Sequence, residues 1–348
     1  MSTAISQRNN DRQIAIWLLF CAGAIFCMVI LGGATRLTHS GLSMVEWKPV
    51  VGVIPPLGES AWQETFEKYK QFPEYKSVNL HMSLKDFKSI FYFEYFHRLL
   101  GRLIGVLFLL PFLYFLARGM IKKPLIPRLI VMFILGGLQG VLGWYMVKSG
   151  LVKDPQVSQY RLTAHLAAAV AIYVYILWVA FGLLSINNVV TSFRRLYQYG
   201  VGLVALIILM IISGGFVAGT RAGLAYNTFP LMNGDFIPPN LYTLEPYWLN
   251  LFENITTIQF NHRMIAYLLI LVIPPFCVFV RQATATRRCQ RAAGFFMAML
   301  AIQVTLGVSA LLTSVPVFLG VAHQGGAILL LTVALFIARE LKPTYTNS

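Results

Sequence analysis

Residues 14–35 read IAIWLLFCAGAIFCMVILGGAT, a run of 22 residues without a single charged side chain. At about 1.5 Å per residue, a helix of this length spans the roughly 30 Å hydrocarbon core of a bilayer. A soluble domain rarely contains so long an apolar run. The run is longer than the core of a signal peptide, and no A-x-A-like cleavage site follows it. This stretch therefore predicts a retained transmembrane helix.

Seven further apolar runs of similar length follow along the chain. Hydrophobic residues make up 57% of the 348 residues and charged residues only 12%, and the mean hydropathy is +0.67. Soluble chains carry about 25% charged residues. We therefore expect an all-α integral membrane protein with eight transmembrane helices, at about 14–35, 95–117, 127–147, 162–184, 199–219, 258–280, 292–312 and 318–338.

The distribution of charge predicts the orientation, because short cytoplasmic loops retain Lys and Arg. The termini and the connectors after spans two, four and six together carry 14 basic and two acidic residues, whereas the other side carries 14 basic and 11 acidic residues. The expected net charges are +12 inside and +3 outside. Both termini are thus expected in the cytoplasm, and the overall charge of +15 requires no nucleic-acid partner.

The second half of the sequence repeats motifs of the first half. Residues 32–56 contain Gly-Gly, Gly-Leu and Ile-Pro-Pro, and residues 214–239 contain the same elements in the same order. Three later pairs of motifs also recur. They are Phe96-His97-Arg98 with Asn261-His262-Arg263, Gln139-x-x-Leu142-Gly143 with Gln303-x-x-Leu306-Gly307, and Ala164-His165 with Ala322-His323.

Each repeat contains four spans, so both repeats start on the same side of the membrane. This pattern predicts two parallel-repeat four-helix bundles, residues 1–190 and 191–348. The first bundle would also carry a large outer loop, about 36–94, with a short interfacial helix around 59–76. Four-helix bundles commonly hold cofactors between facing helices.

Four of the six histidines occupy repeat-related positions, near the outer ends of spans two, four, six and eight. Polar side chains inside a membrane are costly unless they face the bundle interior and have a partner. Two imidazoles on facing helices are most simply explained as axial ligands of a haem iron. Zinc would require four ligands, or three and water, and no cysteine or aspartate is expected at this depth. The predicted iron ligands are His97, His165, His262 and His323.

The two halves differ beside the first histidine of each pair. Span two begins with Glu94 three residues before His97, whereas span six has Gln259 three residues before His262. Residues three apart share a helix face, so Glu94 is expected beside His97 in the first haem pocket. An acid in a low-dielectric pocket marks a functional site. Proton-coupled chemistry is therefore expected in the N-terminal half and electron transfer in the C-terminal half.

Haem propionates require hydrogen-bond donors, and several arginines are predicted at the same depth as the four histidines. The candidates are Arg36, Arg98, Arg102, Arg221 and Arg263.

Taken together, these motifs resemble those of the haem A synthase family. The resemblance rests on Glu94-Tyr-Phe-His97-Arg98, on Gly-Gly-Ala-Thr-Arg36 and Trp47-Lys-Pro, and on Phe-Asn-His262-Arg263 and Ala-His323-Gln. It covers about residues 14–338. The chain has no cysteine pair in an outer loop and is therefore similar to the cysteine-free members found in alphaproteobacteria and mitochondria.

The resemblance implies oxidation of a porphyrin methyl group of haem O to a formyl group by successive hydroxylations, with oxygen derived from water. His97 and His165 would flank the substrate haem O, with Glu94 as a catalytic residue. His262 and His323 would ligate a permanent haem b, with Arg98 and Arg263 among the cofactor-binding residues. The implied partners are haem O, a haem O synthase and an electron acceptor, and the chain could form a homo-oligomer. The implied location is the bacterial inner membrane.

Two other classes fit parts of the pattern. A di-haem b-type cytochrome would use the same eight helices for electron transfer alone, without an acid in only one half. A transporter with parallel repeats would show broken spans at corresponding positions. Pro111 and the Pro274-Pro275 pair do not correspond between the halves, which favours the haem proteins.

Overall fold

The computed structural model describes residues 2–45, 53–151, 156–185, 194–283 and 286–343. Within these ranges the chain is almost entirely helical and contains eight helices long and apolar enough to cross a membrane. The prediction of an all-α membrane protein with eight spans is confirmed. Trp47, which carries part of the family resemblance, and residues 186–193 lie outside the described ranges.

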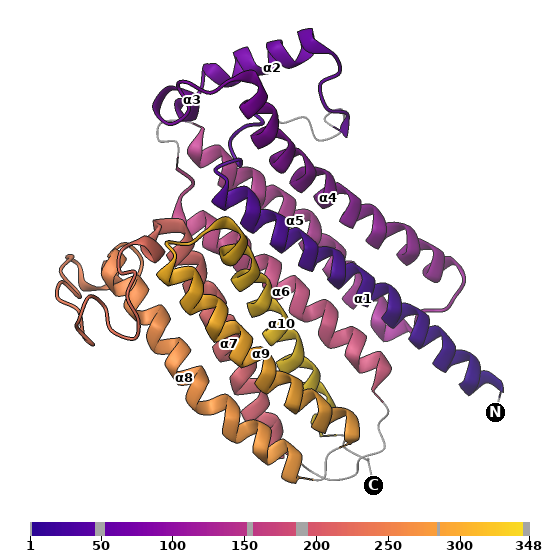
Figure 1. Ribbon diagram of the computed structural model, residues 1–348. Coiled ribbons are helices and arrows are strands. Elements are labelled where there is room, and N and C mark those ends of the chain that lie inside the picture. The colour runs from indigo at the N-terminus through magenta and orange to yellow at the C-terminus, as the bar shows by residue number, and fades with distance from the viewer. Residues whose placement is uncertain (1, 46–52, 152–155, 186–193, 284–285, 344–348) are drawn as a thin grey trace.

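The eight long helices match the eight apolar runs in order (Figure 1). They are α1 (Ser2–Leu37), α4 (Leu84–Ala117), α5 (Ile126–Gly150), α6 (Gln159–Leu184), α7 (Arg194–Thr220), α8 (Ile255–Gln282), α9 (Arg287–Leu312) and α10 (Val317–Glu340). Two short helices, α2 (Glu59–Lys70) and α3 (Pro73–Ser77), lie between the first two spans, where the sequence predicted an interfacial helix. Short 3₁₀ turns occupy Lys123–Leu125, Ala222–Leu224 and Tyr247–Leu251.

Helix α4 begins eleven residues before the predicted span because its start is set by a cap and not by hydropathy. The Ser83 side chain accepts a hydrogen bond from the backbone N–H of Asp86, and the Asp86 carboxylate accepts one from the backbone N–H of Ser83. This capping box satisfies backbone donors that would otherwise lack partners. The polar first turns of α4 therefore extend beyond the apolar run, toward α2 and α3.

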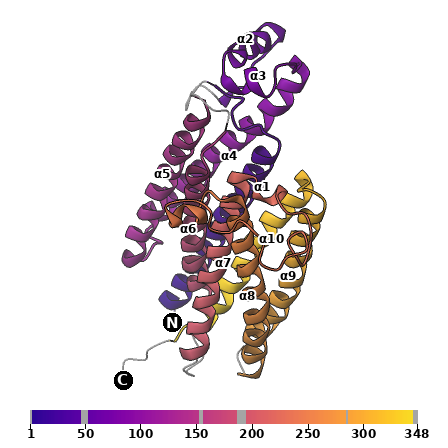
Figure 2. The same ribbon diagram turned by 90° about the vertical axis from the view of Figure 1, so that its left-hand side faces the viewer.

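The helices pack in two adjoining groups of four. Helix α1 packs against α4 and α6, and α5 packs against α4 and α6; α7, α8, α9 and α10 make the corresponding contacts with one another. The groups meet where α6 packs against α7 and where α1 and α6 pack against α10. Figure 2 shows the two groups side by side, with α2 and α3 at one end of the helices.

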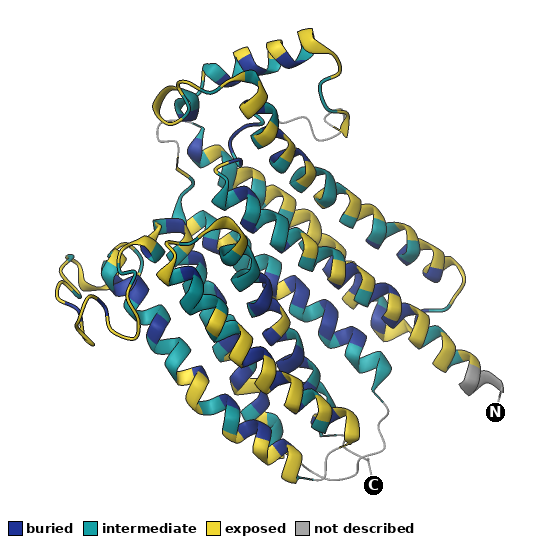
Figure 3. Cartoon of the chain, viewed as in Figure 1, coloured by how far each residue is buried: buried dark blue, intermediate teal, exposed yellow. Residues whose placement is uncertain are grey.

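Burial follows from this packing. Helices α1, α6 and α10 are the most deeply buried spans, whereas α4 and α5 are the least buried (Figure 3). One continuous apolar core runs through both groups. A second, aromatic cluster joins α2 to the start of α4 and is formed by Trp62, Phe66, Tyr69, Phe87, Phe91 and Tyr95. This cluster fixes α2 and α3 over one end of the first group, which we call the α2–α3 end.

Proline 111 shows how a break in the backbone pattern is compensated inside the membrane. Proline has no N–H, so the carbonyl oxygen of Leu107, four residues earlier, loses its helical partner. The indole Nε1–H of Trp17 on α1 donates to this oxygen at 2.9 Å. The contact also holds α1 against α4.

Candidate functional site

The four predicted iron ligands lie in the halves of α4, α6, α8 and α10 nearest the α2–α3 end. His97 of α4 and His165 of α6 are on diagonally opposite helices of the first group, and His262 of α8 and His323 of α10 are on diagonally opposite helices of the second. In each group, the two helices that carry the histidines pack against the same two neighbouring helices. The structure thus places the two histidines of each predicted pair within one group of four helices. The other two histidines, His39 and His81, are exposed.

Each of the four imidazoles lies against a glycine on the preceding long helix. A methyl group on that glycine would come within 3.4 Å of the ring carbon Cε1 or closer, and within 2.7 Å in the tightest case. The imidazole ring fits in this position only because glycine has no side chain. A larger residue would displace the ring. The pairs are Gly32 with His97, Gly143 with His165, Gly214 with His262, and Gly307 with His323.

The repeated Gln-x-x-Leu-Gly motif gains a structural role from these contacts. Residues four apart lie on the same face of a helix. On α9, the Nε2–H of Gln303 donates to the backbone oxygen of His323 at 2.9 Å, and Gly307 contacts the same histidine's ring. On α5, the Nε2–H of Gln139 donates to the backbone oxygen of His165 at 2.8 Å. The motif therefore holds the second histidine of each pair by its backbone and by its ring.

We expect Gly307→Ala to weaken haem binding at the second pair, because the new methyl group would lie 2.7 Å from Cε1 of His323. Overpacking of this kind costs about 1–3 kcal/mol, which corresponds to roughly tenfold or more in affinity. Gly294→Ala, on the same helix, meets open space and is the matched control. The measurement is the haem content of the purified variants, and equal content in both would contradict this role of Gly307.

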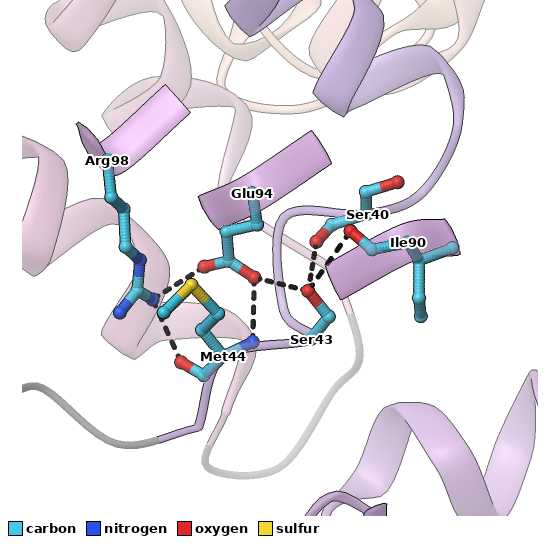
Figure 4. A network of polar contacts seen from close by, with 6 residues as sticks. All are labelled: Ser40, Ser43, Met44, Ile90, Glu94 and Arg98. Atoms are coloured by element: carbon cyan, nitrogen blue, oxygen red, sulfur yellow. Dashed lines mark hydrogen bonds and ion pairs between the residues drawn. The ribbon is translucent and has the colours of Figure 1, made fainter. Parts of the chain in front are cut away.

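Glu94 is buried and all of its partners lie within the N-terminal half (Figure 4). Its Oε2 accepts hydrogen bonds from the Ser43 hydroxyl and from the Met44 backbone N–H, both at 2.8 Å. Its Oε1 forms an ion pair with Arg98, one turn later on α4. Arg98 also donates to the Met44 carbonyl oxygen at 2.9 Å. The carboxylate is therefore held in one orientation by three donors, one of them cationic.

In the second half, a glutamine and an arginine hold the corresponding loop, and no acid takes part in these contacts. The Nε2–H of Gln259 donates to the Tyr226 carbonyl oxygen at 3.2 Å, and Arg263 donates to the same oxygen at 2.8 Å. Arg263 also donates to the carbonyl oxygen of Thr228 at 3.0 Å. Arg98 and Arg263, which the sequence suggested as cofactor-binding residues, thus have partners within the chain and hold the loops that precede α4 and α8.

A second carboxyl group lies buried near Glu94 at the α2–α3 end. The Tyr69 hydroxyl donates to Oε2 of Glu74 at 3.3 Å, and the Nδ2–H of Asn79 donates to the same hydroxyl at 2.7 Å. Burial and, to a lesser extent, the charge of Glu94 raise the pKa of Glu74 to about 7. The α2–α3 segment therefore places an uncharged or weakly charged acid, not a cation, beside the Glu94 network.

The two groups of helices are joined beside the histidine pairs by a second glycine. Gly33, next to Gly32 on α1, faces the side chain of Gln324 on α10, and Gln324 donates to the Val29 carbonyl oxygen at 3.0 Å. On α7, a methyl group on Gly215 would lie 3.0 Å from the hydroxyl of Thr163 on α6. Each Gly-Gly pair therefore contacts a histidine of its own group with its first glycine and the other group with its second.

The donor set fits a haem iron in each pair. No hydrogen bond involves Nε2 of any of the four histidines, and Nδ1 of His97 and of His165 is buried without a partner in the described part of the chain. The same residues contain no group of three or more His, Cys, Asp or Glu that could hold a bare metal ion. Two imidazoles within one four-helix group suit an ion whose other ligands are supplied by a porphyrin.

Sequence reasoning missed Ser43, Met44 and Ser213 as site residues. Ser43 and Met44 lie about 50 residues before Glu94, and nothing in a local pattern pairs them. Ser213 contacts His262, with 3.2 Å between its hydroxyl and Nδ1. The repeat offered a signal for Ser213, because it directly precedes the second Gly-Gly pair as Leu31 precedes the first.

Comparisons with known proteins identify the family of the chain. A model of the COX15-CtaA family, described as cytochrome oxidase assembly protein, matches residues 15–335. A Nitrosospira multiformis protein named heme A synthase is 54% identical over 335 residues, which cover 95% of this chain and 94% of that protein. Proteins of the same name from Nitrosomonas eutropha and Parvibaculum lavamentivorans are 51% and 46% identical, over 97% and 95% of both chains. Since the family model and these relatives span nearly the whole sequence, the chain belongs to the COX15-CtaA family of cytochrome oxidase assembly proteins.

Proposed function

We infer that this protein is a haem A synthase, a membrane oxidoreductase that converts a methyl group of haem O to the formyl group of haem A. The observation that carries this inference is that His97 and His165 lie on diagonally opposite helices of one group, with the buried Glu94 three residues before His97, in a chain whose near-full-length relatives are named heme A synthase. A di-haem cytochrome would need the two histidine pairs but not an ion-paired acid in one half only.

We assign substrate binding and electron transfer to different halves of the chain. The N-terminal half, residues 1–190, would bind haem O between His97 and His165. The C-terminal half, residues 191–348, would bind a haem b between His262 and His323. When bound, haem b supplies a one-electron acceptor for the electrons that leave the methyl group. The residue that corresponds to Glu94 in the second half supports this division, because Gln259 cannot ionise.

Glu94 is proposed to act by its charge. Three donors hold its carboxylate in one orientation, and a fixed negative charge would stabilise positive charge that develops at the methyl carbon during oxidation. Protons released from the substrate require an acceptor, and we propose the Glu94 carboxylate for this role as well. Arg98 and the loop at Ser43 and Met44 would set the position of this charge.

The haem propionates would be bound by arginine donors that the loops leave unused. Among the described residues, Nε–H of Arg36 and of Arg263 is buried without a partner. One terminal nitrogen of Arg36 donates to the Ala218 carbonyl oxygen at the end of α7, and both terminal nitrogens of Arg263 donate to the loop at Tyr226 and Thr228. Each arginine would therefore be held rigidly while one N–H points to a propionate.

The orientation proposed for the chain places both termini in the cytoplasm and both histidine pairs toward the outer face of the bacterial inner membrane. Eight spans bring the start of α1 and the end of α10 to the end opposite α2 and α3 (Figure 1). The excess of basic residues at that end supports this orientation.

Cysteine labelling of intact cells tests the orientation. In a variant without the four native cysteines, a cysteine at Ser83 should react with a membrane-impermeant maleimide, whereas one at Lys123 should react only after lysis. Both positions are described and lie at opposite ends of α4 and its following turn. The reverse order of labelling would refute the orientation.

The chemistry also requires partners. An enzyme that attaches the isoprenoid tail, a haem O synthase, must deliver a membrane-bound substrate, and an electron acceptor must reoxidise haem b. The lipid-facing surfaces of α4 and α5, the least buried spans, leave room for such contacts or for a second copy of the chain.

Pigment analysis decides between the enzyme and a di-haem cytochrome. Cells that make haem O but no haem A should gain haem A, identified by mass in acidic organic extracts, when this chain is expressed. Membranes that gain haem b alone would exclude the enzyme.

A further inference from the structure

The structure treats the Nδ1 atoms of the two histidine pairs differently. In the second group, Nδ1 of His262 lies 3.2 Å from the Ser213 hydroxyl, which can accept a proton, whereas Nδ1 of His323 lies 3.1 Å from Nε2 of Gln303, an amide nitrogen that can only donate. In the first group, Nδ1 of His97 and of His165 is buried, and neither has a hydrogen-bond partner among the described residues. The difference is between sites that otherwise share their histidines, glycines and glutamines.

The serine is the residue that distinguishes the two sites. Gln139 binds the backbone oxygen of His165 as Gln303 binds that of His323, so a glutamine is common to both. The position before the Gly-Gly pair is Ser213 on α7 but Leu31 on α1. A methyl group on Gly32 would lie 3.5 Å from Nδ1 of His97, so this part of α1 borders the ring, and the leucine that precedes Gly32 carries no hydrogen-bonding group.

An imidazole that ligates iron through Nε2 carries its proton on Nδ1. A serine oxygen can accept this proton in a hydrogen bond, which fixes the tautomer, orients the ring and raises the basicity of Nε2. Where Nδ1–H is buried without an acceptor, ligation leaves a donor unsatisfied and binding is weaker. Loss of such a partner typically lowers metal affinity about 10- to 100-fold.

We propose that Ser213 is a positioning residue that makes the C-terminal site retain its haem. The corresponding residue of the N-terminal half is Leu31, which has no hydroxyl, and this leaves the N-terminal site able to exchange haem. This inference rests on the proposed function, in which one haem stays and the other arrives as substrate and leaves as product. A substrate site gains from weaker ligation, because the product must dissociate in every turnover.

The test measures haem retention in the purified full-length protein, with apomyoglobin as the acceptor of released haem. Ser213→Ala should release haem b about 10- to 100-fold faster than wild type. Ser213→Thr, which keeps the hydroxyl, should restore slow release. The midpoint potential of haem b should rise in Ser213→Ala, because a less basic imidazole stabilises ferric iron less.

The transfer variant tests the other half of the inference. Leu31→Ser should slow the release of haem O added to the N-terminal site by a similar factor, with the haem b spectrum unchanged. Release of haem b from Ser213→Ala at the wild-type rate, or haem O release unaffected in Leu31→Ser, would overturn the role of Ser213. A wild-type protein that holds no haem b at all would instead overturn the proposed function, so the two failures are distinguishable.

Discussion

Glu94→Gln should stop haem A formation while haem b stays bound. Glutamine has the size of glutamate and copies Gln259 of the second half, but it cannot ionise. The variant would therefore lose the negative charge that Ser43, Met44 and Arg98 hold in place. An electrostatic contribution of about 3 kcal/mol corresponds to a loss of rate of roughly a hundredfold. Haem O, or a hydroxylated intermediate, should accumulate in membrane extracts.

Ser43→Ala is the matched control for Glu94→Gln. Ser43→Ala removes one donor to the same carboxylate but leaves its charge and its ion pair with Arg98. It should slow the reaction much less than Glu94→Gln if charge is what matters. A Glu94→Gln enzyme that makes haem A at the wild-type rate would show that Glu94 only anchors the loop, as Gln259 does at Tyr226.

His262→Ala and His323→Ala should each remove most of the low-spin haem b spectrum. Each change deletes one of the two axial imidazoles that we assign to this haem. The measurement is the dithionite-reduced minus oxidised spectrum of the purified protein. Undiminished absorbance in both variants would refute the assignment.

Two further histidine variants separate the sites and control for folding. His97→Ala should abolish haem A formation with haem b retained, because His97 lies in the other pair. His81→Ala, at an exposed position outside the helices, should alter neither pigment. If His97→Ala instead removes haem b and spares haem A formation, the two sites are assigned to the wrong halves.

The sequence predicted the spans well because the physical cause of a transmembrane helix is local. Each apolar run of about 20 residues is sufficient to specify a helix in a bilayer. The early start of α4 was not predicted, because Leu84 and the turns after it are specified by the cap at Ser83 and by the aromatic cluster with α2. Hydropathy does not detect either.

The histidine pairs could be predicted because the repeat marks them at equal depth. The glycines that seat the rings were visible as repeated letters, but their role depends on which helix packs against which. Gly307 contacts the ring of His323 only because α9 packs beside α10. The partners of Glu94 likewise depend on a loop that returns to α4 from 50 residues away.

The second glycine of each Gly-Gly pair makes the two halves depend on each other for packing. Gly33 fits against Gln324 of the C-terminal half, and Gly215 fits against Thr163 of the N-terminal half. A larger residue at either glycine would therefore displace a side chain of the other half, Gln324 or Thr163. A second substitution that restores the packing would have to occur in that other half. The histidine partners can differ between the halves, as at Ser213 and Leu31, but the packing at Gly33 and Gly215 restricts how far the two halves can diverge separately.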